Sequence, residues 1–316
     1  MGKASRTKVE VNRKEKIAAQ RAAERRAERR RRILIASGSI VAVVAVVLAF
    51  VIFKLNSKPS ASAGSASNGP TGAALAAVVD KVTSVPTSVS DAVGNGGSAL
   101  LSAGKPTTVS GSPLTANGKP EILYMGAEYC PYCAAERWAM IVALSRFGTF
   151  SGLATVHSAV SDGAGSQEPY PNTPTFTFAH ASYSSPYLSF SPVELQTNIP
   201  DPSNGSYTTL QTPTAAQQAL ITKYDAPPYV TSSQAGAIPF LDFGNKYVSI
   251  GVSYSNQTLA GLSWSTIAND LSNPNSAVAQ AVDGTANYIT AAICKMTGNQ
   301  PASACTSTVQ SLESQI

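Results

Sequence analysis

The sequence predicts an α/β domain preceded by one transmembrane helix, and three stretches lead to that prediction. Residues 33–53, ILIASGSIVAVVAVVLAFVIF, contain no charged residue and no proline. Residues 121–127, EILYMGA, are a short apolar run typical of a buried strand, and Cys-Pro-Tyr-Cys begins three residues after the end of this run. Residues 237–251, AIPFLDFGNKYVSIG, indicate two strands joined by a turn at Gly244-Asn245-Lys246.

The apolar run over 33–53 has the length of a membrane anchor. As a helix its 21 residues would span about 31 Å, close to the thickness of the bilayer core. A cleaved signal peptide has a shorter apolar region of about 7–15 residues. The small residues that suit a cleavage site, Ala61-Ser62-Ala63, lie well beyond the run. The length therefore favours an uncleaved anchor over a signal peptide.

Charge is segregated along the chain. Residues 1–32 contain 13 Lys and Arg and 4 Asp and Glu, whereas the remaining residues contain 10 and 14. Positive charge directly before the span places the N-terminus in the cytoplasm. A basic helix that binds anionic lipid or nucleic acid has a similar composition. A signal that sets the membrane topology already accounts for these charges, so we expect no nucleic-acid partner.

These observations divide the chain into four parts. We expect a basic cytoplasmic tail over 1–32, a single transmembrane helix over 33–53, a flexible Ser, Ala, Gly and Pro-rich linker over 54–72, and an extracytoplasmic domain over 73–316. The expected location is thus the cell membrane, with the folded domain outside the cytoplasm.

The two cysteines of Cys-Pro-Tyr-Cys occupy the start of a predicted helix. Pro131 suits a first helical turn, and apolar residues recur at helical spacing from Ala134 to a natural stop at Gly148. At a helix N-terminus, free N–H groups and the helix dipole stabilise a thiolate, which predicts that Cys130 attacks disulfides. Cys133 lies one turn inside the helix and would resolve the mixed disulfide.

A strand, Cys-x-x-Cys and a helix, in that order, begin a thioredoxin-like fold. We expect a second strand over 153–160 and a closing helix over 259–271, with an insertion over 162–235 between the second strand and the strand that follows Pro239. The segment beginning Ile238-Pro239 resembles the Ile-Pro-strand-turn-strand-Gly segment of thioredoxins. That resemblance implies that Pro239 is cis and lies beside Cys130.

A narrower resemblance covers approximately residues 75–316. YMGAEYCPYCAAERW, TFTFAHASYSSPYLSF, IPFLDFGNKY and a C-terminal cysteine pair resemble a membrane-anchored, thioredoxin-like family catalogued as a domain of unknown function, family 929. More distantly, the chain resembles the disulfide-bond-forming thioredoxin relatives of the bacterial cell envelope.

Several residues around the dithiol depart from the thioredoxin pattern. Tyr124 stands where thioredoxins carry a buried aspartate, and Tyr129 stands where they carry a tryptophan. Glu128 is the nearest acid, but we expect it on the other face of the strand. The pair Pro131-Tyr132 resembles that of glutaredoxins. Those enzymes are cytosolic, so a domain expected outside the cytoplasm is not expected to act as a glutaredoxin. Without the buried base, an oxidase or isomerase is favoured over a reductase.

The insertion is rich in Ser, Thr, Pro and aromatic residues. Its aromatic side chains either line a groove for unfolded polypeptide or cover the sheet, and the second arrangement is the commoner one. They are Phe176, Phe178, Tyr183, Tyr187 and Phe190.

Cys294 and Cys305 enclose ten residues between two helical segments, which predicts a hairpin closed by a structural disulfide. The alternative is a second redox pair that relays electrons to the dithiol. A zinc site would need four ligands, and neither His157 nor His180 has ligand spacing to the other. We expect no bound metal, although two thiolates also suit Cu(I).

The sequence therefore predicts an extracytoplasmic thiol–disulfide oxidoreductase, either an oxidase or an isomerase, that acts on cysteine-containing proteins without a bound cofactor. By analogy, a quinone-linked membrane protein would reoxidise it. One alternative is a non-catalytic binding or scaffold module whose Cys-Pro-Tyr-Cys disulfide is structural. The other is a thioredoxin relative that handles Cu(I).

Overall fold

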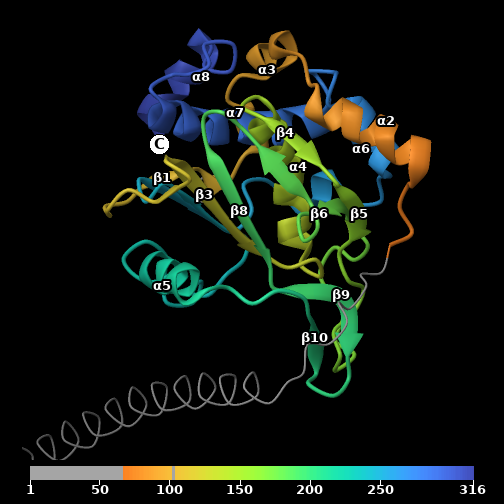
Figure 1. Cartoon of the computed structure of the whole chain (residues 1–316). Helices are drawn as coiled ribbons and strands as arrows, with labels where there is room; N and C mark the ends of the chain where they lie inside the picture. Colours follow the sequence, from red (N-terminus) through yellow and green to blue (C-terminus); the bar gives the residue numbers. More distant parts are fainter. Residues whose placement is uncertain (1–66, 102–103) are drawn as a thin grey trace, which may run out of the picture. The chain divides into compact units, whose positions relative to one another are not determined.

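The computed structural model describes residues 67–101 and 104–316. The expected tail over 1–32, the expected transmembrane helix over 33–53 and most of the expected linker over 54–72 lie outside the described residues. Within the two ranges that are described, no helix is both long and apolar enough to cross a membrane. These residues form a mixed α/β domain built around one mixed sheet (Figure 1).

The central strand of the sheet is β3, which pairs in parallel with β8 and antiparallel with β11. β12 and then β1 extend the sheet beyond β11, and β2 pairs with the first two residues of β3. These strands are β1 (Thr107–Thr108), β2 (Thr115–Ala116), β3 (Lys119–Gly126), β8 (Ser189–Glu194), β11 (Phe240–Phe243) and β12 (Tyr247–Ile250).

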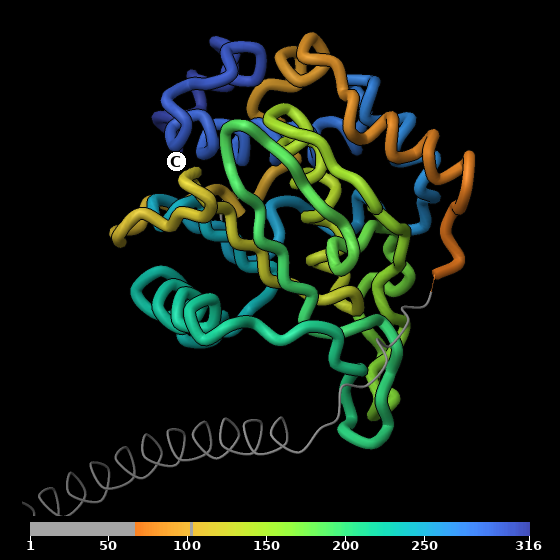
Figure 2. Tube along the Cα trace, in the orientation of Figure 1, coloured from red at the N-terminus to blue at the C-terminus, as the bar shows by residue number. Residues whose placement is uncertain are grey.

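Helices lie on both faces of this sheet, and Figure 2 follows them along the trace. α4 follows β3 directly and packs against α7. The α-helices are α2 (Gly72–Thr83), α3 (Thr87–Val93), α4 (Pro131–Ser145), α5 (Ala215–Tyr224), α6 (Trp264–Asp270), α7 (Ala277–Thr297) and α8 (Ser307–Leu312), and the 3-10 helices are η1 (Gly97–Ala99), η3 (Asn256–Thr258) and η4 (Glu313–Gln315).

The side chains of β3 alternate between two separate cores. Ile122 and Tyr124 belong to the large core that contains α4, α6 and α7, whereas Leu123 and Met125 belong to a smaller core on the other face. This alternation is what a strand requires when both of its faces are covered. It explains why residues 122–126 read as one continuous apolar run in the sequence.

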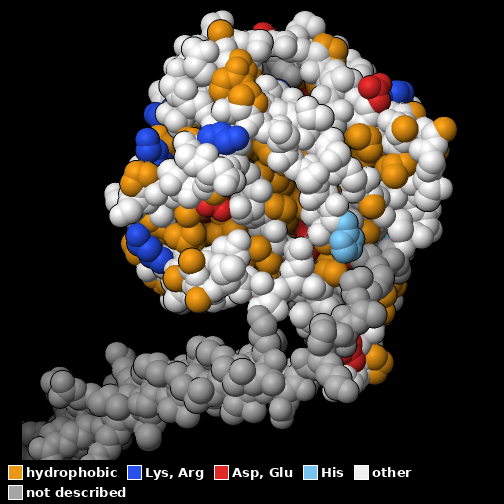
Figure 3. Space-filling model, viewed as in Figure 1, with side chains coloured by type: hydrophobic (Ala, Val, Ile, Leu, Met, Phe, Trp, Pro, Cys, Tyr) orange, Lys and Arg blue, Asp and Glu red, His pale blue; other side chains and the backbone are white. Residues whose placement is uncertain are grey.

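The second face of the sheet is covered mainly by α5. Tyr224 is buried in the smaller core, while Leu220 and Ile221 of the same helix remain half-buried against it. In Figure 3 hydrophobic side chains gather in a hollowed surface beside the region of α5. One ten-residue helix therefore leaves this face less completely covered than the face under α4 and α7.

The strand expected over 153–160 is present as β5 (Ala154–His157), but it does not join the central sheet. It pairs with β6 (Pro174–Thr177), and the parallel neighbour of β3 is β8, inside the expected insertion. The expected insertion over 162–235 therefore contains a strand of the central sheet. β8 has the sequence SFSPVE, and its proline is tolerated because an edge strand does not need every N–H group for pairing. That polar pattern does not read as a buried parallel strand.

The remaining short strands form two antiparallel pairs. β4 (Thr149–Ser151) pairs with β7 (Ser182–Ser184), and β9 (Gln196–Asp201) pairs with β10 (Ser206–Thr209). The aromatic residues of the expected insertion pack on the large core instead of lining a groove. Phe176 and Phe178 are fully buried, and Tyr183, Tyr187 and Phe190 are partly buried against them.

The expected elements after residue 236 are confirmed. β11 and β12 form the predicted hairpin, with Gly244 (φ 66°) and Asn245 (φ 58°) in the left-handed conformation of its turn. The closing helix is α6, which is shorter than the expected 259–271 because Ser263 caps its N-terminus by accepting a hydrogen bond from Thr266 N–H.

Glu136 is a carboxyl group enclosed within the large core side of α4. One oxygen accepts a hydrogen bond from Ser253 N–H at 3.0 Å, and the other lies 3.0 Å from the Ser253 hydroxyl. Burial raises the pKa of Glu136 to about 7, and the two hydrogen bonds from Ser253 offset only part of that rise. The side chain is therefore largely protonated in the folded protein below neutral pH.

We expect Glu136→Gln to reduce the loss of stability that accompanies rising pH. The pKa of Glu136 in the folded protein is raised above its usual value of 4.5. Its contribution to the free energy of unfolding is therefore fully present below pH 4.5 and is lost as the pH rises through about 7. At pH 8 the variant should be about 2–3 kcal/mol more stable relative to wild type than at pH 4. Urea denaturation at several pH values measures this difference, with Asp80→Asn at an exposed carboxylate as the control. Parallel pH dependence in Glu136→Gln and wild type would contradict it.

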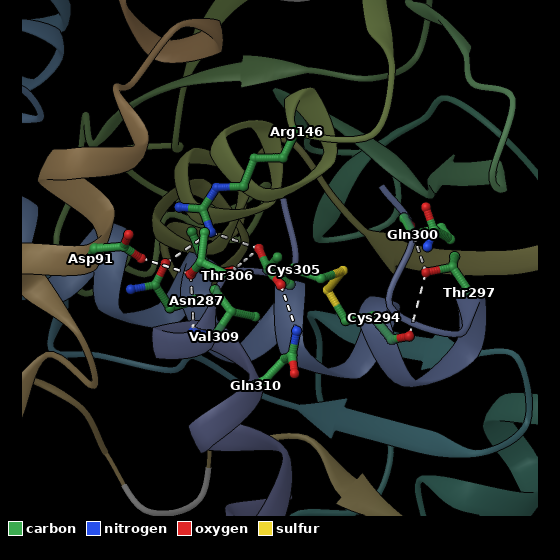
Figure 4. Close-up of a disulfide and its surroundings, with 12 residues drawn as sticks. Asp91, Arg146, Asn287, Cys294, Thr297, Gln300, Cys305, Thr306, Val309 and Gln310 are labelled. Atoms are coloured by element: carbon green, nitrogen blue, oxygen red, sulfur yellow. Dashed lines mark hydrogen bonds between the residues drawn. A yellow bond between two sulfur atoms is a disulfide. The ribbon is translucent and has the colours of Figure 1, made fainter. Parts of the chain in front are cut away.

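The C-terminal helices are joined by the predicted disulfide between Cys294 and Cys305 (Figure 4). Both cysteines are buried, and Ala304 lines a small cavity together with Arg146 at the end of α4. The dithiol begins the same helix, whose 15 residues span about 22 Å. This separation favours the structural interpretation of the disulfide over an electron relay.

Replacing both Cys294 and Cys305 with serine should lower the free energy of unfolding by about 2–3 kcal/mol. The disulfide closes a loop with a sequence separation of 11, and its removal restores chain entropy to the unfolded state. Thermal and urea denaturation measure the loss. Thiol exchange at Cys130 should be unchanged in the same variant, and loss of that exchange in a folded protein would show that the pair is a relay.

Candidate active site

Cys130 and Cys133 lie together at the N-terminus of α4, as the sequence predicts. Cys130 is the N-cap residue, and its Sγ accepts a hydrogen bond from Cys133 N–H at 3.3 Å. Pro131 occupies the first helical position, where a missing N–H group leaves no acceptor unpaired. Since β3 ends at Gly126, only four residues separate the sheet from the helix that carries both thiols.

The two thiols are both free in this structure, but their surroundings differ. Cys130 is 4% exposed and Cys133 has no exposed surface. Burial opposes ionisation of Cys130 most strongly, yet hydrogen bonds from the Cys133 side chain and backbone, together with the charge of Arg137, lower the pKa of Cys130. Burial, followed by the interaction with Cys130, raises the pKa of Cys133 well above its usual value. The geometry thus makes Cys130 the more acidic thiol.

The segment before β11 reaches the dithiol. The Ile238–Pro239 peptide bond is cis, as expected, and the Cys130 thiol lies 3.8 Å from the Ile238 carbonyl oxygen. Ile238 also packs on a small apolar cluster formed by Ala127 and both thiols. Pro239 is anchored on its other side, because its carbonyl accepts a hydrogen bond from Gly251 N–H at 2.8 Å.

The aromatic residues beside the dithiol face different surroundings. Tyr129 stacks on Tyr207 of β10, with ring centroids 4.1 Å apart and an angle of 9° between the rings. Tyr132, between the two cysteines, is 37% exposed and presents the outer surface of the motif. Glu128 is fully buried, and its backbone N–H donates to Gln196 O at 2.9 Å. The β9–β10 hairpin therefore supports the approach to Cys130.

Sequence reasoning missed a fully buried ion pair near the dithiol. Arg137 lies one turn after Cys133 on α4, and Glu194 ends β8. Arg137 Nε and Nη2 donate to the two carboxylate oxygens of Glu194 at 2.8 and 2.6 Å, and Nη2 also donates to Ala127 O at 2.8 Å. The signal available in the sequence was a lone arginine inside an apolar helix face, four residues after Cys133.

The histidines occupy separate structural positions. His157 ends β5, and its Nδ1 lies 2.9 Å from Ser158 O, while His180 belongs to the loop before β7. Among residues 67–101 and 104–316, no group of three or more His, Cys, Asp and Glu side chains is arranged to hold a metal ion.

A surface cavity lies beside the segment that leads to Ile238. Its volume is about 500 Å³, and neither thiol lines it. The cavity is therefore not part of the dithiol site. Its walls are formed by β12 and the 227–234 segment, through Lys105, Thr107, Pro227, Pro228, Tyr229, Val230, Thr231, Ser232, Gln234, Val248 and Ile250.

Comparison with known proteins identifies one family. The family described as Domain of unknown function (DUF929) matches residues 105–295, which include both thiols, the Arg137–Glu194 pair and Pro239. This match covers more than half of the chain, so the chain belongs to that family. No curated protein and no solved structure matches the chain.

Proposed function

We propose that this member of the DUF929 family is a thiol–disulfide oxidoreductase with a thioredoxin-like fold and a Cys130–Cys133 dithiol. The observation that carries the proposal is the pairing of an N-cap thiol of lowered pKa with a second cysteine, one turn inside the helix, whose backbone N–H donates a hydrogen bond to that thiol. A structural cysteine pair needs no such difference between its two members.

The arrangement of the sheet supports the thioredoxin-like part of the proposal. A parallel pair, β3 and β8, lies next to an antiparallel hairpin, β11 and β12, and the dithiol helix follows the central strand. Ile238, directly before β11, is in contact with Cys130. The pairing of β3 with β11 thus brings the segment that contains Ile238 to Cys130 Sγ, although the two are far apart in the sequence.

The proposed direction is oxidation of protein thiols. A substrate thiolate attacks Cys130 Sγ of the oxidised enzyme, a mixed disulfide forms, and the electron pair of the broken S–S bond goes to Cys133. A second substrate thiolate then attacks the substrate sulfur of the mixed disulfide and releases Cys130 as a thiolate. The substrate gains a disulfide, the enzyme gains two electrons, and a quinone-linked membrane protein would accept them.

The proposed location follows from the sequence of residues 1–53. A basic tail before a charge-free run of 21 residues favours a cytoplasmic N-terminus and a domain outside the cytoplasm, where disulfides persist. A protease added to intact cells should remove the domain and spare the tail. Protection of the domain would overturn both the location and the preference for oxidation.

The proposed activity is tested by mixing the oxidised protein with a reduced, unfolded secretory protein and following free thiols in the substrate. We expect one substrate disulfide per enzyme disulfide reduced, and further turnovers when an oxidant such as glutathione disulfide is supplied. Cys130→Ser with Cys133→Ser is the matched control. Equal rates for the wild type and this control would favour the scaffold interpretation, in which the motif forms a static disulfide.

A further inference from the structure

Two buried donor groups lie behind Cys133 without an acceptor. Arg137 Nη1 and the Tyr124 hydroxyl are both buried, and neither has a hydrogen-bond partner among the residues described. An unused buried donor costs about 1–3 kcal/mol, so two of them close to one thiol need an explanation. The guanidinium of Arg137 lies over the Tyr124 ring, 5.8 Å from its centroid, so the two groups are adjacent.

The backbone at Gly126 shows how close Tyr124 and Cys133 are. A Cβ at this position would collide with the Tyr124 hydroxyl, and the same point is 3.1 Å from Cys133 Sγ. The absence of a side chain at Gly126 therefore leaves the tyrosine oxygen and the cysteine sulfur beside each other. Arg137 reaches the same region because residues four apart share one face of a helix.

The charges around Cys133 are fixed by burial and pairing. Burial raises the pKa of Tyr124 well above its usual value, so the hydroxyl stays protonated and is a donor. Burial acts against the charge of Arg137, but Glu194 more than restores it and raises the pKa of the guanidinium. The groups that act on the Cys133 thiol are thus Cys130, the backbone of Ala127, the Arg137 cation with its Glu194 partner, and the neutral Tyr124 hydroxyl.

We propose that Tyr124 and Arg137 stabilise the Cys133 thiolate that is released when the Cys130–Cys133 disulfide opens, and that Glu194 positions Arg137 for this task. The inference rests on the proposed function and explains how the site works without the aspartate that Tyr124 replaces. When a substrate thiolate bonds to Cys130 Sγ, the S–S electron pair and a negative charge pass to Cys133 Sγ. The unused donors Tyr124 Oη–H and Arg137 Nη1–H are the groups placed to receive that charge.

This arrangement favours oxidation of substrates. A carboxylate beside the inner thiol would accept its proton, whereas a cation and a neutral donor lower the free energy of its thiolate. Stabilising the Cys133 thiolate as it leaves lowers the barrier to attack of a substrate thiolate on Cys130 Sγ. The same pair of residues therefore assists the first step of substrate oxidation and accounts for the two buried donors.

Tyr124→Phe is the sharpest test, because it removes one oxygen that has no acceptor and should leave the stability unchanged or slightly higher. We expect the rate constant for attack of the glutathione thiolate on the disulfide to fall about fivefold, and the Cys133 thiolate, followed by its ultraviolet absorbance during a pH titration, to form at higher pH. Arg137→Gln with Glu194→Gln should lower the same rate constant about tenfold.

Glu194→Gln alone leaves the cation without its anion and should shift both measurements in the opposite direction. Rate constants and thiolate titrations equal to wild type in Tyr124→Phe and in the double variant would overturn the inference, whether or not Glu194→Gln folds. The reaction with glutathione needs no protein substrate. Lowered rate constants in these variants of a protein that oxidises no protein substrate would therefore refute the proposed function and support this inference.

Discussion

Cys133→Ser should accumulate covalent adducts between Cys130 and substrate proteins, whereas the wild type should show almost none. Cys130 has the lowered pKa and retains 4% of its surface, so it is the thiol that attacks. With serine at position 133, no second thiol is present to resolve the mixed disulfide. Non-reducing gels and mass spectrometry of proteins trapped in intact cells measure the adducts, and reduction with dithiothreitol should release them.

Cys130→Ser is the matched control for this experiment. Cys133 has no exposed surface and its pKa is raised, so this variant should form at least tenfold fewer adducts. Adducts that appear in Cys130→Ser instead would reverse the assigned roles. An ordinary thiol titration for Cys130, near pH 8.5, would also contradict the assignment.

Glu194→Ala should lower the free energy of unfolding by about 3–5 kcal/mol. Removing the carboxylate leaves the fully buried Arg137 guanidinium without its ion pair, and the unpaired charge is the source of the cost. The substitution also removes an acceptor of the Phe178 N–H group at 3.2 Å. Urea denaturation of the isolated domain measures the change, which should exceed that of removing the C-terminal disulfide.

The matched control replaces both charges by apolar residues of similar size, Arg137→Met with Glu194→Leu. A buried ion pair is often no more stabilising than such a replacement, so the double variant should be far more stable than Glu194→Ala. A small effect of Glu194→Ala, below about 1 kcal/mol, would show that water reaches the pair and that the two charges are not enclosed in solution.

The local chemistry of the candidate site was predictable from sequence because it is encoded within short segments. Cys-Pro-Tyr-Cys carries its own helix start through Pro131, and the apolar run before it has the length of a buried strand. The contact between Cys130 and Ile238 was expected only from the thioredoxin resemblance, because 108 residues separate them. Spacing alone does not predict such a contact.

The parts that sequence did not predict depend on long-range pairing. β8 is a polar, proline-containing strand. Its pairing with β3 depends on its position at the edge of the sheet and on packing, not on a strand pattern in its own sequence. Arg137 and Glu194 are 57 residues apart, and the sequence does not show that they pair until β8 is placed beside β3. The donor pair behind Cys133 becomes visible only after both placements are known.

The reduction potential of the Cys130–Cys133 pair tests the central claim most directly. The purified domain is equilibrated in glutathione buffers of graded composition, and the fraction of reduced dithiol is measured by alkylation and mass spectrometry. A redox-active pair predicts reversible titration at a potential between about −120 and −270 mV, the range of catalytic dithiols. A value at or below about −300 mV, typical of structural disulfides, would contradict the proposed function.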